Sequence, residues 1–347
     1  MKRFVFIFLG FLIAYSSFAQ SADLQPAATV NLIRTEPITV RQLKNDVERM
    51  EKGSGRPLTQ AERMQVLDVV INERLVLQAA ERDRISISDN EVNQQMQQFR
   101  SGMQQQLGRQ PTDAEFAQAV MNESGLDVNA FKDQLKRQMI VQKYLMTKKS
   151  DLLNSVKAPT EQEIINEYNI LKAQLVRPDT IRFSMIQVQY GPDAASRTKA
   201  RTLADSLVKE INNDPSKFDE VAAKSVAPNS GYQAGDAGYL ARNQEARQLV
   251  GQAFMDVAFG LKQGQVSRLI EGQQGFQIIK VTENYASKNL ELADIFQLGT
   301  RVTVREYVSQ LLNNRKQQAI VTQASQELVT ELRTGKTFQI FENNIKW

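Results

Sequence analysis

The side chains used most often for nucleophilic, acid–base and metal chemistry are missing from this sequence. Its 347 residues include no histidine and no cysteine. Their absence excludes thiol catalysis, a Ser–His–Asp triad and a zinc site of the common kind. Asp205, Asp219 and Asp236 form no acid–base pair that spacing alone would indicate, and no glycine-rich phosphate loop is present. The sequence predicts no metal and no cofactor, and it favours binding over bond-breaking chemistry.

Methionine and phenylalanine recur at helical spacing in one segment, where they could bind apolar polypeptide. Val92, Met96, Phe99, Met103 and Leu107 fall on one face of a predicted helix. Because methionine adapts its shape easily, Met96, Phe99 and Met103 could line an adaptable groove for an apolar peptide. The alternative is that this stripe builds a helical core. The glutamines between positions 94 and 106 are expected to be a solvated face.

Four Thr/Ser-x-x-Glu capping boxes predict the helices that must position these residues. In each box the hydroxyl can satisfy a free backbone N–H, and the glutamate can reach back to the first residue. The four pairs are Thr59/Glu62, Ser88/Glu91, Thr112/Glu115 and Thr160/Glu163. Apolar stripes follow the first box (Leu67, Val70, Ile71, Leu75, Ala79) and Asp127 (Phe131, Leu135, Met139, Met146).

The two ends of the chain predict short strands. Ala28–Arg34 and Ile38–Val40 form a predicted hairpin after a disordered leader over residues 20–28, and a helix follows from Arg41. Near the other end, a long helix over 301–333 precedes an alternating run, Thr337–Phe341. The terminal strand could pair with the hairpin, which gives an otherwise marginal two-stranded ribbon a third strand.

The composition and the N-terminal residues limit the class to which the protein can belong. The formal net charge is +4, without the concentrated basic patch that nucleic-acid binding needs. Met1–Arg3 is basic, and the apolar run that follows, to Tyr15, is too short for a comfortable membrane span. Ser17-Phe-Ala19 supplies small residues at the spacing that precedes a signal-peptide cleavage site. We expect a signal peptide over residues 1–19, cleaved near Ala19, and an exported, periplasmic mature protein without a stable membrane span.

The stretch from Ile181 to Asn284 resembles the parvulin family of peptidyl-prolyl isomerases. The resemblance rests on Ile181–Val188, on the loop Ser225–Tyr239 with its Gly235-Asp-Ala-Gly238 turn, and on Gly275–Val281. Parvulins commonly carry histidines in patterns such as H-I-L-V and G-[FY]-H-I-I-K-V. The resemblance implies a compact α+β domain in which the glycine turn sets the fold rather than the chemistry.

The departures from the parvulin pattern fall at its chemically important positions. Ser184 is assigned to the first histidine position, Gln277 to the second, and Ala227 to a position that is commonly Cys or Asp. Phe254 matches the phenylalanine of the proline pocket, and Val250 falls where that pocket often has methionine. Ser184 and Gln277 could hydrogen-bond to each other or support neighbouring strands. The domain is therefore expected to bind peptide at Val250 and Phe254 and to have no catalytic residues.

The order of the segments resembles SurA-type periplasmic chaperones and, more distantly, PrsA-type foldases. The matching stretches are Val69–Gln78 through Glu91, and Gly125–Met139. The resemblance implies a mainly α protein with one α+β parvulin-like domain, and a discontinuous chaperone module that the N- and C-terminal segments build together. The expected boundaries are 20–159 for the N-terminal helical domain, 160–177 for a connecting helix, 178–285 for the parvulin-like domain and 286–347 for the completing segment.

The family implies a function in handling unfolded chains. We expect an ATP-independent chaperone that binds unfolded exported polypeptides, outer-membrane proteins in particular. Isomerisation needs no nucleophile or metal, only a site that favours the twisted amide over the planar one. An active peptidyl-prolyl isomerase with a variant site therefore stays open as the alternative. A secreted scaffold or adhesin that has reused the fold is the third.

Overall fold

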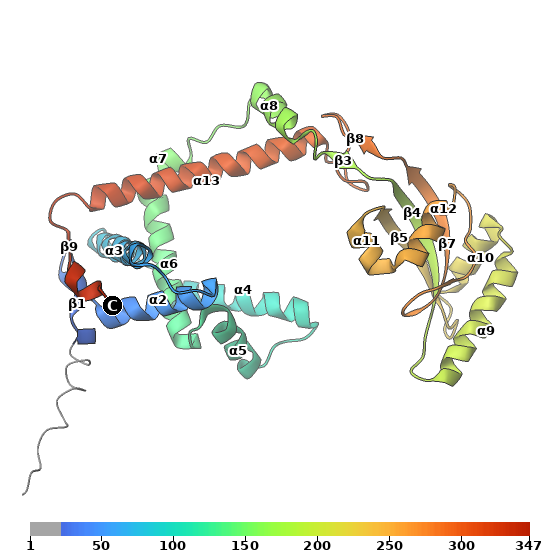
Figure 1. The fold of residues 1–347 in the computed structure, drawn as a ribbon, viewed down its shortest axis with the longest axis horizontal. Helices are drawn as coiled ribbons and strands as arrows, with labels where there is room; N and C mark the ends of the chain where they lie inside the picture. Colours follow the sequence, from blue (N-terminus) through green and yellow to red (C-terminus); the bar gives the residue numbers. More distant parts are fainter. Residues whose placement is uncertain (1–21) are drawn as a thin grey trace, which may run out of the picture. The chain divides into compact units, whose positions relative to one another are not determined.

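The computed structural model describes residues 22–347, so the expected signal peptide over residues 1–19 lies outside the described residues. The chain divides into two compact units (Figure 1). The first unit runs to Lys157 and resumes over Lys316–Trp347, and the second is Ala158–Arg315. A helical module and a parvulin-like α+β domain make up the fold, as the sequence predicts.

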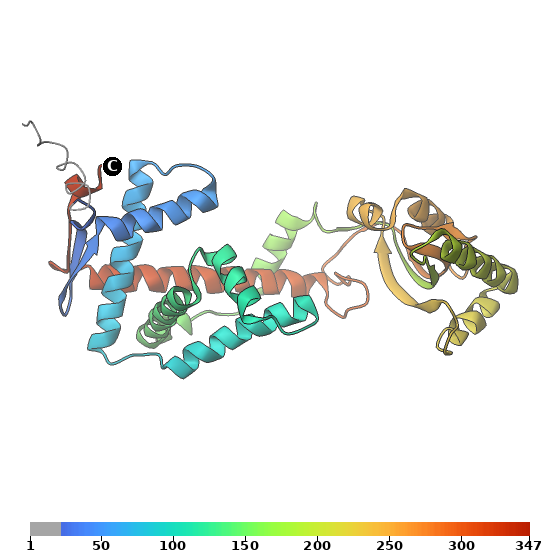
Figure 2. The same cartoon turned by 90° about the horizontal axis from the view of Figure 1, so that it is seen from below.

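The first unit joins a small sheet to a set of helices. Its sheet has the order β2-β1-β9, and β9 pairs antiparallel with β1 as Thr29 faces Gln339. Figures 1 and 2 show the red C-terminal segment beside the blue N-terminal strand. The elements are β1 (Pro26–Asn31), β2 (Thr35–Thr39), α2 (Val40–Ser54), α3 (Gln60–Arg82), α4 (Asp89–Leu107), α5 (Asp113–Ser124), α6 (Val128–Lys148), α7 (Ser150–Leu153), β9 (Phe338–Ile340) and the 3-10 helix η1 (Glu342–Ile345).

Local signals determine where the helices of this unit begin. Three of the four predicted capping boxes open helices here, and Thr39 with Gln42 forms another at α2. The fourth predicted box, Thr160 with Glu163, opens α8 (Glu161–Leu171) in the second unit. Gly55, at φ 69°, ends α2 in the left-handed conformation that glycine adopts at little cost. The predicted disordered leader is too long, because β1 begins at Pro26 and Ala27 and Ala28 are fully buried.

The core of the first unit lies between the hairpin, α2, α3 and α6. Leu67, Ile71, Leu75 and Ala79 are buried as the α3 stripe predicts. On α6 the buried residue is Tyr144, whereas Met146, expected on the apolar face, is 59% exposed. The phenol of Tyr144 donates to Asp83, which gives its polar end a partner.

One buried polar side chain ties the hairpin turn to α3. Gln78 is 1% exposed, its Oε1 accepts from the amides of Leu32 and Ile33 at 3.1 Å, and its Nε2 donates to Glu36. Every polar atom of the buried amide therefore has a partner, which makes its burial tolerable.

The second unit is built around a four-stranded antiparallel sheet of order β5-β4-β7-β6, with a two-stranded β3-β8 ribbon beside it. One long helix, α13 (Val304–Leu332), contributes residues to both units. The other elements are α8 (Glu161–Leu171), β3 (Val176–Arg177), β4 (Thr180–Gln189), α9 (Ala194–Ile211), α10 (Pro215–Lys224), β5 (Gln233–Ala241), α11 (Gln244–Val250), α12 (Gln252–Gly260), β6 (Ile270–Glu271), β7 (Gly275–Tyr285) and β8 (Lys288–Asn289).

The division of the chain differs from the one that the sequence predicts. The expected connecting helix and residues 286–315 lie in the second unit. The first turns of α13 pack there, with Val304 and Val308 buried against Ile164 and Tyr168 of α8. Only the half from Lys316 onward, with buried Ala324, Leu328 and Leu332, belongs to the first unit. The apolar residues of α13 are interrupted by the polar run Asn313–Gln318, and the helix passes from one unit to the other within this run.

Candidate polypeptide-binding site

The central strands of the second unit present two different faces. β4 and β7 pair antiparallel, with Ile186 opposite Ile278 and Gln187 opposite Gln277. Because side chains alternate along a strand, these two pairs lie on opposite faces of the sheet. Ile186 and Ile278 pack in a core with α9 and α10. The face of Gln277 also carries Ile279, which packs in a second core with Phe254 of α12.

Ser184 lies on the wrong face to accompany Gln277. It is opposite Lys280, three residues from the pair of Gln187 with Gln277, and therefore on the α9/α10 face. Of the two possibilities named above, a hydrogen bond between Ser184 and Gln277 does not fit this register, and support of neighbouring strands stays open. If the H-I-L-V pattern is aligned one residue later, its first position falls on Met185. Its isoleucine and valine then match Ile186 and Val188. A slip of one residue exchanges the two faces of a strand.

Met185 is the residue that the structure places on the face of Gln277. It is opposite Ile279, so Met185 and Gln277 are diagonal neighbours with Cα atoms about 7–8 Å apart. Met185 is half-buried against the second core. The amide of Gln277 lies beside Gly272, where an added Cβ would be 3.2 Å from its Oε1. A thioether and an amide on this face can accept or donate hydrogen bonds, and neither titrates near neutral pH.

The expected pocket residues contribute mainly to the core. Phe254 is 3% exposed, and its ring centroid is 5.7 Å from that of Phe183. Val250 is half-buried against the same core. Phe254 has little surface left for a peptide, so Val250 is the more accessible of the two. Ala227 is exposed in the loop between α10 and β5, where its amide donates to the Lys224 carbonyl.

A closed polar cluster holds the glycine turn of β5. Arg182 pairs with Asp236 at 2.6 Å and with Glu283 at 3.0 Å, and the phenols of Tyr239 and Tyr285 donate to Glu283. The Arg182 guanidinium lowers the pKa of Asp236, and the bond to Glu283 raises the pKa of Tyr285 to about 12. Asp236 also accepts from the Gly238 amide. The charges satisfy one another, which supports a role in the fold.

In the first unit, the predicted methionine–phenylalanine stripe is partly covered. Phe99 lies 5.9 Å, centroid to centroid, from both Phe116 of α5 and Phe131 of α6. Phe99, Met96 and Met103 are half-buried, and Leu107 is 47% exposed. The contacts of Phe99 fit the alternative that this stripe builds a core between helices.

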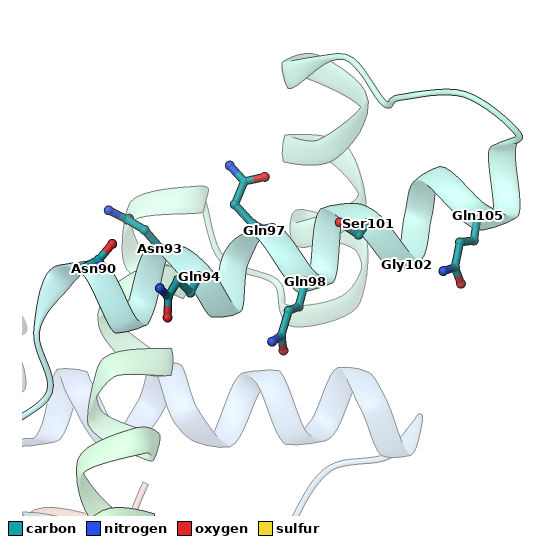
Figure 3. A pocket seen from close by; sticks show the side chains of 8 residues that line it. All are labelled: Asn90, Asn93, Gln94, Gln97, Gln98, Ser101, Gly102 and Gln105. Carbon is teal, nitrogen blue, oxygen red and sulfur yellow. The ribbon is translucent and has the colours of Figure 1, made fainter.

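The polar face of α4 forms a shallow groove of about 670 Å³. Figure 3 shows its amide side chains following one another along the helix. The lining residues are Asn90, Asn93, Gln94, Gln97, Gln98, Ser101, Gly102 and Gln105. The groove carries no charged residue, and its exposed glutamines are solvated as the sequence predicts.

A larger cleft, about 1170 Å³, opens between α2, α3, α5 and α6 of the first unit, and the sequence analysis does not identify it. Met50 and Val69 line it and are 54% and 66% exposed. Leu58, Val66 and Val70 add apolar surface. The sequence contains one hint of this cleft. Val69 is an apolar residue of α3 that lies outside the stripe formed by Leu67, Val70 and Ile71.

Most of the charges around this cleft are paired. Arg49 pairs with Asp46, Arg56 with Glu62 at 2.5 Å, and Arg137 with Glu73 at 3.2 Å. Arg56 and the amide of Thr59 hold the pKa of Glu62 at about 2, so this carboxylate is ionised at neutral pH. A lining that mixes exposed apolar side chains with amides and mostly paired charges suits an uncharged, apolar or aromatic segment, because arginine also stacks on aromatic rings.

No group of residues that could hold a metal ion occurs within residues 22–347. Over the same range, no helix combines the length and apolarity needed to cross a membrane.

Family comparisons agree with this two-unit architecture. Residues 3–145 match a SurA-like N-terminal domain, and residues 168–285 match a PPIC-type PPIase domain. The chain thus matches a SurA-like N-terminal domain followed by one PPIC-type PPIase domain, and the resemblance stated from the sequence is confirmed.

Individual relatives carry the names of chaperones and foldases. The chain is 26% identical to Chaperone SurA of Saccharophagus degradans over 89% of its length and 69% of that protein. It is 23% identical to Chaperone SurA of Pseudoalteromonas translucida over 79% of its length, but spans only 61% of that relative. Foldase protein PrsA of Clostridium botulinum is 22% identical over 94% of this chain and 86% of that protein.

Solved structures of similar proteins align over most of the chain. One, from work on two SurA-like chaperones of Campylobacter jejuni, is 18% identical over 88% of this chain and 99% of that chain, with a TM-score of 0.32. PrsA from Bacillus subtilis is 21% identical over 86% of this chain and 90% of that chain, with a TM-score of 0.27.

Proposed function

We propose that this protein is an ATP-independent periplasmic chaperone that binds unfolded exported polypeptides, outer-membrane proteins among them. The observation that carries the proposal is the cleft of the first unit, where Met50 and Val69 stay exposed among paired charges. Its volume exceeds that of most small-molecule sites, and the exposed apolar side chains in its lining suit a chain segment. The signal-like N-terminus and the chaperone and foldase names of the relatives support the same function.

An aggregation assay without ATP tests this function. The full chain should suppress light scattering when an unfolded outer-membrane β-barrel protein is diluted from urea. Met50→Glu with Val69→Glu should weaken client binding by about tenfold or more, since each buried apolar side chain contributes roughly 1.5–3 kcal/mol. Both positions are exposed on helices, so the fold should survive the change.

The matched control is Ile170→Glu on α8, an equally drastic change at a residue that is 71% exposed in the second unit. It should leave suppression unchanged. If the parent chain does not suppress aggregation, the chaperone proposal fails. If the Met50/Val69 variant is folded and fully active, the cleft is not the binding site.

We further propose that the parvulin-type domain isomerises X–Pro bonds weakly or not at all. Met185 and Gln277 take the places of the usual histidines, Ala227 supplies no polar group, and Phe254 is enclosed in the core. A variant site remains the alternative, because the match to the PPIC-type domain covers residues 168–285.

A proline-limited refolding assay separates the two. The full chain should accelerate refolding far less than an ordinary parvulin at equal concentration. Val250→Ala, which shortens an accessible half-buried side chain, should change this residual rate little. Efficient acceleration that Val250→Ala removes would establish the alternative, an active isomerase with a variant site.

A further inference from the structure

The outer edge of β5 in the second unit is unpaired. β5 pairs with β4 from Thr180 opposite Ala241 to Gln187 opposite Gln233, and it is the terminal strand of the sheet. Within residues 22–347, no backbone hydrogen bond joins Gln233–Ala237 to any segment other than β4. A strand at the edge of a sheet leaves a row of N–H and C=O groups free to pair with another chain.

This edge lacks the side chains that usually protect such strands. β5 contains no proline and no lysine, and its one charged residue, Asp236, is held by Arg182 of the neighbouring strand. By contrast β2, an edge strand of the first unit, carries Glu36 and Pro37. The register shift at Ala237 bends β5, which limits an added strand to a few residues on each side.

Gly235 has no role within the fold that requires glycine. Its φ is not in the left-handed region, and a Cβ added there would meet nothing within 4 Å. Glycine inside a strand weakens it, and it often marks a place where another backbone approaches closely. Gly235 and its neighbours Asp236 and Ala237 are exposed, so the approach to this edge is open.

We propose that β5 binds a short extended segment of a client polypeptide by strand addition, through main-chain hydrogen bonds along Gln233–Ala237. The preferred segment is uncharged and rich in small or β-branched residues, because β5 itself offers glycine and alanine rather than pockets or charges. This second site rests on the proposed chaperone function. The edge of β5 would bind client segments with strand propensity, while the cleft of the first unit binds apolar or aromatic segments.

Hydrogen exchange on the full-length protein tests the proposal. The probe is a nine-residue peptide of alternating threonine and valine, and its control is the same peptide N-methylated at every second residue. The unmodified peptide should slow exchange of amides in Gly235–Gly238 by at least about tenfold at saturation. The methylated peptide should not, because it lacks the N–H groups that pair with the edge.

Two substitutions at an exposed position sharpen the test. Ala237→Lys should abolish the protection, since lysine on an edge opposes strand addition, while Ala237→Thr should retain it. Equal protection by both peptides would overturn strand addition. A chain that suppresses aggregation but shows no β5 protection would overturn this inference and leave the chaperone function standing. A chain that does neither would overturn both.

Discussion

Replacing Ile345 with alanine is expected to lower the free energy of unfolding of the first unit by about 2–5 kcal/mol. Ile345 is 1% exposed and packs in the same core as Leu43, Leu67 and Leu332. Because buried side chains of α3 and the hairpin pack in the same core, the change leaves a cavity that adds to the cost. Fluorescence of Trp347, the single tryptophan, reports on this corner during urea unfolding.

The cost should be larger when the whole C-terminal segment is lost. A chain that ends at Lys336 loses β9 and η1, together with bonds from the Phe341 amide to the Ala27 carbonyl and from the Asn344 side chain to the Pro26 carbonyl. The hairpin then returns to two strands, which are marginal in water. Lys346→Ala, at an exposed neighbour, is the control and should change stability by less than about 0.5 kcal/mol. Because the truncation also removes Trp347, circular dichroism of the helices follows its unfolding, and a stable, cooperatively unfolding chain would contradict the expectation.

The features that the sequence predicts correctly are those that depend on near neighbours. The box of Thr59 with Glu62 needs only residues three apart, and its bonds form as expected. The pairing of Thr337–Phe341 with the hairpin spans the chain, yet it follows from alternation and from the need of a hairpin for a third strand. In both cases the sequence pattern leaves few competing arrangements.

The features that the sequence analysis misplaces or misses depend on register or on distant packing. Ser184 and Met185 are adjacent, and only the pairing of β4 with β7 shows which one shares a face with Gln277. Register shifts at Phe183 on both sides of β4 make this segment harder to place by alternation. The exposed surface at Met50 and Val69 arises because four helices leave a cleft, which no local pattern records.

Phe254→Ala is expected to destabilise the second unit by about 3–5 kcal/mol, and this follows from packing rather than from catalysis. The Phe254 ring is almost fully buried against Phe183, and such an aromatic pair adds about 0.5–1.5 kcal/mol beyond the area that it buries. Hydrogen exchange of the β4 and β7 amides measures this unit separately from the first one, which a single global transition would not do.

The effect should be confined to the second unit and should scale with lost volume. Phe254→Leu should cost less than Phe254→Ala because leucine refills part of the cavity, and Val250→Ala, at a half-buried position, should cost less than either. Any loss of isomerase activity in Phe254→Ala would then reflect unfolding, so Val250→Ala is the better probe of a peptide pocket. If Phe254→Ala leaves hydrogen exchange of the β4 and β7 amides unchanged, the ring does not stabilise the core. The role of Phe254 in a proline pocket would then regain support.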